Sequence, residues 1–141
     1  MIKILILDDS QDLLEAMKIF FEKKDLQVKI LSNHLNITEE IETYKPDILL
    51  LDIILPMADG REICKKLRED PKNKNLCIML ISSSSTILRE YKKYGADGWI
   101  EKPFDFQKIV EEMYSVLITC KDEYPPLLKK PFHKSFFIKN S

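Results

Sequence analysis

The sequence predicts an α/β protein whose core is a doubly wound sheet of five parallel strands between two layers of helices. Short apolar runs alternate five times with stretches of helical periodicity, which is typical of successive βαβ units. Two of these runs, residues 48–51 and 78–81, are apolar throughout, as expected for parallel strands that are buried on both faces.

The first half of the chain predicts two strands and two helices. A strand at about residues 3–7 is followed by a helix that Ser10 caps, and residues 26–31 form a second strand. In that strand Val28 and Ile30 alternate with polar residues, as on the edge of a sheet. The apolar faces of the two helices consist of Leu13, Leu14, Met17, Phe20 and Phe21, and of Ile37, Ile41 and Tyr44.

The second half begins with the most continuously apolar strand, residues 47–51, which we place in the centre of the sheet. Gly95 and Asp105 have the residue types that end and begin helices. The elements after residue 51 are a loop with Pro56 and Asp59-Gly60, a helix bearing Ile63, Cys64 and Leu67, a strand at 76–81, a short helix at 86–94, a strand at 98–101, and a last helix bearing Phe106, Ile109, Val110, Met113 and Leu117. Five such units in succession fit a flavodoxin-like (βα)5 three-layer sandwich.

Length and composition indicate one globular domain. The chain has 141 residues, 22 basic and 23 acidic side chains and a net charge of −1, so its overall charge favours neither nucleic acid nor a membrane surface as a partner. The N-terminus lacks the apolar core of a signal peptide, and no run is long enough to span a bilayer. We therefore expect a cytoplasmic protein.

The regular pattern stops near residue 120. We expect residues 1–120 to form the domain and residues 121–141 to form a C-terminal tail or linker, with no second domain. The tail combines lysines and phenylalanines, but its charge excess is modest, so direct nucleic-acid binding is not expected. Whether the chain stands alone or is a fragment of a longer protein stays open.

The three cysteines are Cys64, Cys77 and Cys120, each within an apolar pattern and far from the others. No CxxC pair accompanies them, so the sequence suggests neither a zinc site nor a disulfide framework. We expect all three to be buried, reduced thiols.

Polar residues follow four of the apolar runs, and these are the candidate functional residues. Asp8 and Asp9 follow the first strand, and Asp52 follows the third. Ser82 and Lys102 follow the fourth and fifth strands. Ligands of open α/β sheets bind outside the carboxyl ends of the strands, so these side chains should meet in one crevice.

This set of groups suits a hard divalent cation and a phosphoryl group. Adjacent buried carboxylates repel each other unless a cation lies between them, and Mg²⁺ prefers oxygen ligands. Asp52 could act as a nucleophile, while Lys102 and Ser82 could stabilise phosphoryl oxygens. The simpler alternative for Asp8 and Asp9 is a solvated acidic turn that caps the first helix.

In these motifs the chain resembles the receiver domain of two-component response regulators, the CheY-like family. The matching segments are ILDDS at residues 6–10, LDIILPMADG at 51–60, ISS at 81–83 and GADGWIEKPF at 95–104, within a resemblance that covers residues 1–120. No single segment is specific, but the combination in this order is.

The resemblance implies that Asp52 is the phosphoacceptor for a sensor histidine kinase or a phosphotransfer protein. It also implies that Mg²⁺, or Mn²⁺, is bound by Asp8, Asp9, Asp52 and the backbone carbonyl of Ile54. In the same way Ser82 corresponds to the switch hydroxyl, Lys102 to the family's lysine, and the bond before Pro103 to a cis peptide. The only reactions expected are the domain's own phosphorylation and dephosphorylation.

The chain departs from the family pattern at three places. The switch aromatic, usually Tyr or Phe, is Trp99, whose main physical role we expect to be burial in the core. The loop after the fourth strand is about two residues short, so Ser83 is an alternative to Ser82 as the switch hydroxyl. The position two residues after Asp52 is the apolar Ile54, which should hinder water and make the phosphorylated state long-lived.

Two other functions and one partner surface complete the expectations. One is an aspartyl-phosphate phosphohydrolase similar to the haloacid-dehalogenase-like phosphatases. That resemblance implies a second acid two residues after the nucleophile, where this chain has Ile54, or Ser10 if Asp8 were the nucleophile. A pseudo-receiver that never takes phosphate is the other alternative. By resemblance, downstream effectors bind the face formed by residues 86–94, 98–101 and the last helix, and the same face makes a homodimer possible.

Overall fold

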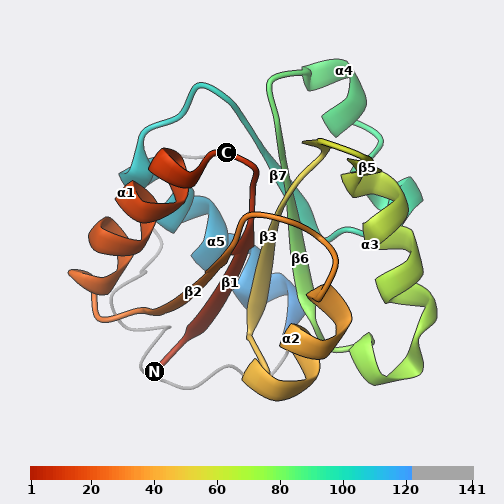
Figure 1. The fold of residues 1–141 in the computed structure, drawn as a ribbon, viewed down its shortest axis with the longest axis horizontal. Helices are drawn as coiled ribbons and strands as arrows, with labels where there is room; N and C mark the ends of the chain where they lie inside the picture. The colour runs from red at the N-terminus through yellow and green to blue at the C-terminus, as the bar shows by residue number, and fades with distance from the viewer. Residues whose placement is uncertain (122–141) are drawn as a thin grey trace.

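Five parallel strands form the central sheet of the computed structural model, which describes residues 1–121 (Figure 1). They are β1 (Lys3–Leu7), β2 (Gln27–Leu31), β3 (Ile48–Asp52), β6 (Cys77–Ser82) and β7 (Gly98–Glu101). The strand order is β2-β1-β3-β6-β7, and every neighbouring pair is parallel. This order confirms the predicted doubly wound, flavodoxin-like sheet.

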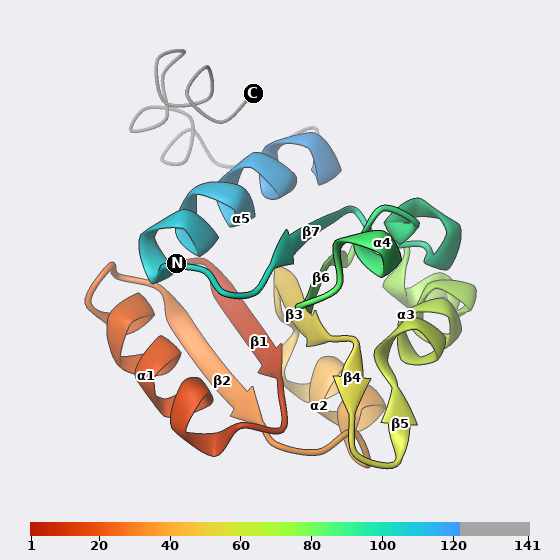
Figure 2. The ribbon, with the colours of Figure 1, turned by 90° about the horizontal axis from the view of Figure 1, so that it is seen from above.

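Helices cover both faces of the sheet (Figure 2). On one side lie α1 (Gln11–Glu22) and α5 (Phe106–Cys120), and on the other α2 (Ile37–Tyr44) and α3 (Gly60–Glu69). Successive residues of a strand point to opposite faces, so each strand serves both layers. In β1, Ile4 and Ile6 pack with α1 and α5, whereas Leu5 and Leu7 pack with α2 and α3.

The burial of the strands follows their positions in the sheet. All five residues of the central strand β3 are buried. In β2, at one edge, Val28 is buried but its neighbours are partly or fully exposed. The continuous apolar run and the alternating one therefore predicted the central and the edge strand correctly.

The capping residues expected from the sequence take the expected roles. The side chain of Ser10 accepts a hydrogen bond from Leu13 N at 3.3 Å, and that of Asp105 accepts one from Lys108 N at 2.7 Å. Gly95 has φ +85°, the left-handed conformation that ends a helix.

The expected helix over residues 86–94 is wrong. The structure has a four-residue α4 (Ser85–Leu88), followed by a 3-10 turn η2 (Tyr91–Tyr94). Between them Glu90 leaves the helical region with φ −92° and ψ +17°, and its amide donates to Ile87 O, three residues back. Helical bonding is therefore interrupted after one turn of α4.

Three small elements were not predicted. The loop after β3 contains a hairpin of two antiparallel strands, β4 (Ile54–Leu55) and β5 (Ala58–Asp59), each two residues long. A 3-10 turn, η1 (Pro71–Asn73), follows α3. The hairpin turns at Met57, which has φ +62° and is 97% exposed. Such short ladders lack the periodic apolar pattern from which longer strands are predicted.

The expectation for the cysteines was wrong for two of the three. Cys77, the first residue of β6, forms a disulfide with Cys120, the last residue of α5, across a Cα–Cα distance of 6.0 Å. Packing of α5 on the sheet brings together residues 43 positions apart, which spacing along the chain does not reveal. Cys64 is a buried free thiol, as expected.

No helix among residues 1–121 combines the length and the apolar character that a membrane span requires. The predicted tail, residues 121–141, lies outside the described residues except for Lys121.

Candidate functional site

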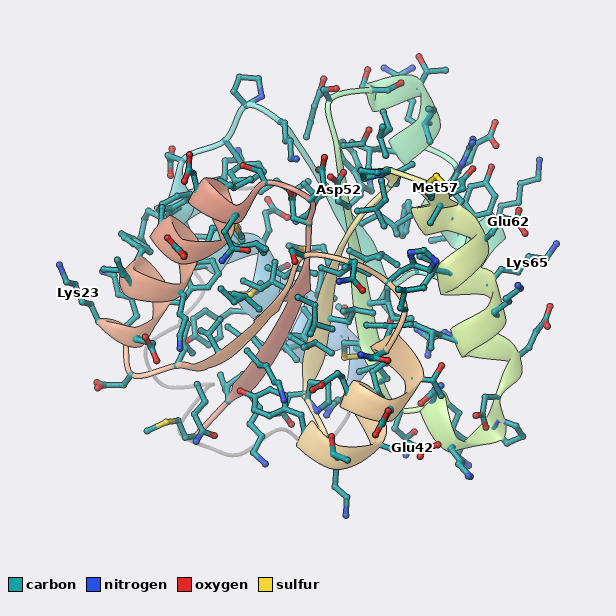
Figure 3. All side chains as sticks on the ribbon, in the orientation of Figure 1. Lys23, Glu42, Asp52, Met57, Glu62 and Lys65 are labelled. Atoms are coloured by element: carbon teal, nitrogen blue, oxygen red, sulfur yellow. A yellow bond between two sulfur atoms is a disulfide. The ribbon has the colours of Figure 1, made fainter. Side chains whose placement is uncertain are left out.

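The predicted site residues lie together at the carboxyl edge of the sheet. Asp52 is the last residue of β3 and Ser82 the last of β6, while Asp8 and Lys102 directly follow β1 and β7. Figure 3 shows Asp52 at the upper end of the sheet, between the two helical layers. The parallel direction of the strands thus collects groups that are up to 94 residues apart in sequence.

Lys102 links the two buried acids. Its Nζ atom lies 3.0 Å from Asp8 Oδ2 and 3.5 Å from Asp52 Oδ2. The side chain of Lys102 is 28% exposed, whereas Asp8 and Asp52 are 1% and 3% exposed. One ammonium therefore serves two carboxylates that have almost no access to water.

The acidic cluster has the composition of a site for a divalent cation. Carboxylate oxygens of Asp8, Asp9 and Asp52 lie within 4.8 Å of one another, and Asp9 is the exposed member. Three carboxylates against one ammonium leave an excess of two negative charges. A hard divalent cation with oxygen ligands matches both the charge and the donor type.

The ionisation of the site reflects this excess charge. Burial, reinforced by the negative charge of Asp8, raises the pKa of Asp52 from 3.8 to about 6, although Lys102 acts in the opposite direction. Burial by itself would lower the pKa of Lys102, but its hydrogen bond to Asp8 and the charge of Asp52 outweigh this and raise it. Lys102 is therefore cationic while Asp52 is unusually easy to protonate.

Backbone contacts hold Asp52 in position. Its Oδ1 accepts a hydrogen bond from Ile54 N at 3.3 Å, and Gly60 N donates to Ile53 O at 2.7 Å. A Cβ atom at Gly60 would overlap the carbonyl oxygen of Asp52. Gly60 is thus required for the close approach of α3 to the end of β3, a role that the sequence reasoning missed because Asp59-Gly60 read only as a turn.

The structure places Ser82, not Ser83, in the buried part of the site. Ser82 is 1% exposed and its Oγ accepts a hydrogen bond from Ser84 N at 3.2 Å, whereas Ser83 is exposed. The amide of Lys102 donates to Ser82 O at 2.8 Å, which joins the ends of β6 and β7. The bond between Lys102 and Pro103 is cis, as predicted.

Trp99 is not buried in the core, in contrast to our expectation. It is 36% exposed and lines a groove between β7 and α5, together with Tyr91 and Phe104. The reason is the alternation along β7, in which Gly98 and Ile100 are buried and Trp99 and Glu101 face outward.

A comparison with protein families identifies the family of the chain. A family model for the response regulator receiver domain matches residues 4–114. The chain belongs to this family. It is therefore a receiver domain of two-component signal transduction, and its family's role is signalling rather than turnover of a separate substrate.

Curated relatives of this receiver domain are bacterial response regulators. It is 31% identical to the sensory transduction protein BceR of Halalkalibacterium halodurans over 83% of this chain and 50% of BceR. It is 32% identical to the transcriptional regulatory protein YvcP of Bacillus subtilis over 91% of this chain and 54% of YvcP. The chain thus spans about half the length of the curated relatives it matches.

Solved structures support the fold of the receiver domain. A CheY-like receiver domain protein of Methanospirillum hungatei has a TM-score of 0.78 at 24% identity and covers 88% of this chain and 99% of its own. TrrA of Thermotoga maritima, solved in complex with Mg²⁺-BeF, has a TM-score of 0.73 at 23% identity and covers 82% of this chain and 99% of its own. The match to the receiver-domain family model favours the receiver over the phosphohydrolase alternative.

Proposed function

We propose that this receiver domain is phosphorylated on Asp52 by a sensor histidine kinase or a phosphotransfer protein. The single observation that carries the proposal is the position of Lys102 Nζ, 3.5 Å from Asp52 and 3.0 Å from Asp8 in a nearly buried site. In the reaction a bond forms between a carboxylate oxygen of Asp52 and phosphorus. The bond from phosphorus to the donor's imidazole nitrogen breaks.

Side chains of the site stabilise the transferred group. Lys102 neutralises one phosphoryl oxygen, and the hydroxyl of Ser82 donates a hydrogen bond to another. Asp8, Asp9, Asp52 and the backbone carbonyl of Ile54 would hold Mg²⁺, or Mn²⁺ in its place. The bound cation would neutralise charge on the phosphoryl oxygens. Hydrolysis of the acyl phosphate at the same site then returns the domain to its resting state.

Signalling follows from movement of Ser82 and Lys102 toward the phosphoryl group. Ser82 ends β6 and Lys102 directly follows β7, and these strands connect to the face formed by α4, η2, β7 and α5. Trp99 projects from this face and serves as the switch aromatic in the proposal. Because Trp99 is already outward in this structure, the change it undergoes would begin from an exposed position.

We propose the same face as the binding surface for the downstream effector and for a possible homodimer. The groove beside Trp99 contains aromatic and acidic side chains, among them Tyr91, Glu101 and Glu112. Residues 1–120 would act as the receiver, with residues 121–141 as a tail or linker that does not itself bind nucleic acid. We propose a cytoplasmic location, where the domain would meet the phosphohistidine of the donor protein.

Acetyl phosphate and Mg²⁺ provide a direct test. Intact mass after incubation should show one phosphoryl adduct on the wild-type chain and none on Asp52→Ala. Asp12→Ala, which removes an exposed acid on α1, is the matched control and should be phosphorylated normally. Absence of an adduct on the wild type would favour the pseudo-receiver, and catalytic release of phosphate from varied substrates would favour the hydrolase.

A further inference from the structure

The disulfide lies at the opposite end of the sheet from Asp52. Cys77 begins β6 and Ser82 ends it, so the bond is separated from the phosphorylation site by roughly 17 Å of strand. The bond joins this end of the sheet to the last residue of α5. No step of the proposed phosphoryl transfer uses either cysteine.

The two sulfur-bearing residues differ in access. Cys77 is fully buried in the core between the sheet and α5, whereas Cys120 is partly exposed at the end of the helix. A dissolved thiol or oxidant therefore reaches the bond from the side of Cys120. Cys64 lies in the other core layer, fully buried, and burial raises the pKa of its thiol to about 12. It is an unreactive internal reference.

The surroundings of the pair favour a sulfur–sulfur bond over a ligand site. A carboxylate oxygen of Asp97 lies within 4.8 Å of both cysteine sulfurs. However, Asp97 Oδ2 already accepts hydrogen bonds from Arg68 Nη2 and from Ile78 N, both at 2.9 Å. The carboxylate is thus engaged in joining α3 to the start of β6.

We propose that Cys77 and Cys120 form a reversible thiol–disulfide site that fastens or releases the C-terminal end of α5. Disulfides inside cells are usually transient and redox-sensing, which is the setting proposed for this domain. The proposal concerns a site that phosphorylation does not touch and does not depend on the phosphorylation of Asp52.

The chemistry requires a peroxide as oxidant and a dithiol as reductant. The thiol of Cys120 loses its proton, its sulfur attacks one oxygen of hydrogen peroxide, and the O–O bond breaks. The departing hydroxide takes up a proton, so that a sulfenic acid and one water result. The sulfur of Cys77 then attacks the sulfur of Cys120, the S–S bond forms and the S–O bond breaks. The thiol proton of Cys77 passes to the departing hydroxyl group, which leaves as a second water. A dithiol reverses the change, taking up the oxidation as its own disulfide and returning two thiols.

Release affects only the last turn of α5. Buried apolar residues, including Ile109, Val110 and Met113, hold the rest of the helix on the sheet in either redox state. Beyond Cys120, Lys121 Nζ forms an ion pair with Asp47 Oδ1 at 3.3 Å. This partly exposed ion pair holds the end of the helix more weakly than the disulfide does. Thr119, which lies in this last turn, lines the groove beside Trp99, so the redox state bears on the proposed partner surface.

The test counts free thiols in the full-length chain. Reduced protein is treated with hydrogen peroxide, quenched with N-ethylmaleimide under denaturing conditions, and weighed intact. Of its three cysteines, the reduced wild type should carry a label on each, and the peroxide-treated chain on Cys64 alone. Cys64→Ser should retain the peroxide response, and Cys120→Ser should lose it. Labelling of all three after oxidation, or only intermolecular disulfides, would overturn the proposal.

A second measurement tests the release of the helix end. On reduction, amide hydrogen exchange at residues 117–121 should rise several-fold while exchange in α1 stays unchanged, and the midpoint of thermal unfolding should fall by about 10 °C. Both effects should be absent in Cys120→Ser and present in Asp52→Ala. Equal exchange at residues 117–121 in the two redox states would refute the fastening role, whatever the result for phosphorylation.

Discussion

At the scale of single residues, Asp52 is both the proposed phosphoacceptor and a buried charge that destabilises the folded domain. Its carboxylate is 3% exposed and faces a second buried acid, Asp8. Without a bound cation, the charge of Lys102 and the hydrogen bond from Ile54 N offset this repulsion in part. The folded domain would therefore be more stable with a neutral side chain at the position that we propose as the phosphoacceptor.

Replacing Asp52 by Asn should stabilise the metal-free domain at neutral pH. The native pKa of about 6 exceeds the ordinary 3.8, so the native state binds a proton more tightly. The resulting contribution to stability is complete below pH about 3.8 and is lost as the pH rises through about 6. In EDTA at pH 7, Asp52→Asn should therefore raise the free energy of unfolding by about 1–3 kcal/mol in urea titrations. A gain of the same size at pH 4 would contradict this account.

Ile54 should control how long the phosphoryl group remains on Asp52. Its amide contacts Asp52 Oδ1 at 3.3 Å, and its side chain is 59% exposed at the rim of the site. An apolar group there cannot orient an attacking water, so Ile54→Asn should speed loss of phosphate by about threefold to tenfold. The rate is measured by intact mass after removal of acetyl phosphate. Met57→Asn, on the same hairpin but 97% exposed, is the control and should leave the rate of phosphate loss unchanged. If Ile54→Asn lost phosphate at the wild-type rate, Ile54 would not have this role.

At the scale of elements, Arg68 joins α3 to the amino-terminal side of the sheet. Its guanidinium donates to the carbonyls of Gly95, Asn73 and Leu76 at 2.8–2.9 Å. It also forms an ion pair with Asp97 at 2.9 Å, and its side chain is only 23% exposed. Several separate connections thus meet on one side chain.

Arg68→Ala should lower the free energy of unfolding by about 2–4 kcal/mol, because partly buried carbonyls and a carboxylate lose their donor. Lys65→Ala, an exposed position on the same helix, should change it by less than about 0.5 kcal/mol. Urea unfolding of the two variants provides the comparison. Similar small effects from both would show that the network around Arg68 contributes little.

The elements that the sequence predicted well are those with long, regular patterns. The runs at 48–51 and 78–81 identified central strands, because a strand buried on both faces must be apolar throughout. The pattern over 86–94 misled us because apolar spacing does not reveal where Glu90 interrupts the hydrogen bonds. The outward position of Trp99 could have been read from its alternation with Gly98 and Ile100.

At the scale of the whole molecule, the binding of Mg²⁺ should be visible as global stability. A cation that binds the folded acidic cluster but not the unfolded chain adds about 2.7 kcal/mol when its free concentration is 100 times its Kd. The thermal unfolding midpoint should rise with the Mg²⁺ concentration and fall in EDTA. Asp8→Asn should abolish most of the rise, whereas Asp12→Asn should not. A midpoint independent of Mg²⁺ in the wild type would rule out binding at this cluster.

The candidate site was more predictable than the rest of the molecule. The parallel topology alone dictates that the site residues meet, because Asp52 and Ser82 end strands and Asp8 and Lys102 directly follow strands. The contact of Gly60 with Asp52 and the bond of Cys77 to Cys120 depend instead on how closely α3 and α5 approach the sheet. Such distances follow from side-chain packing across layers, which no local pattern encodes.

The separation of Asp8 and Lys102 by 94 residues has a consequence during synthesis. The ribosome adds Asp8 and Asp52 to the growing chain long before it adds Lys102, which forms ion pairs with both. The contact between Lys102 and Asp8 cannot form until β7 has left the exit tunnel and paired with β6. The site that we propose for phosphorylation is therefore complete only after β7 has been made and has joined the sheet.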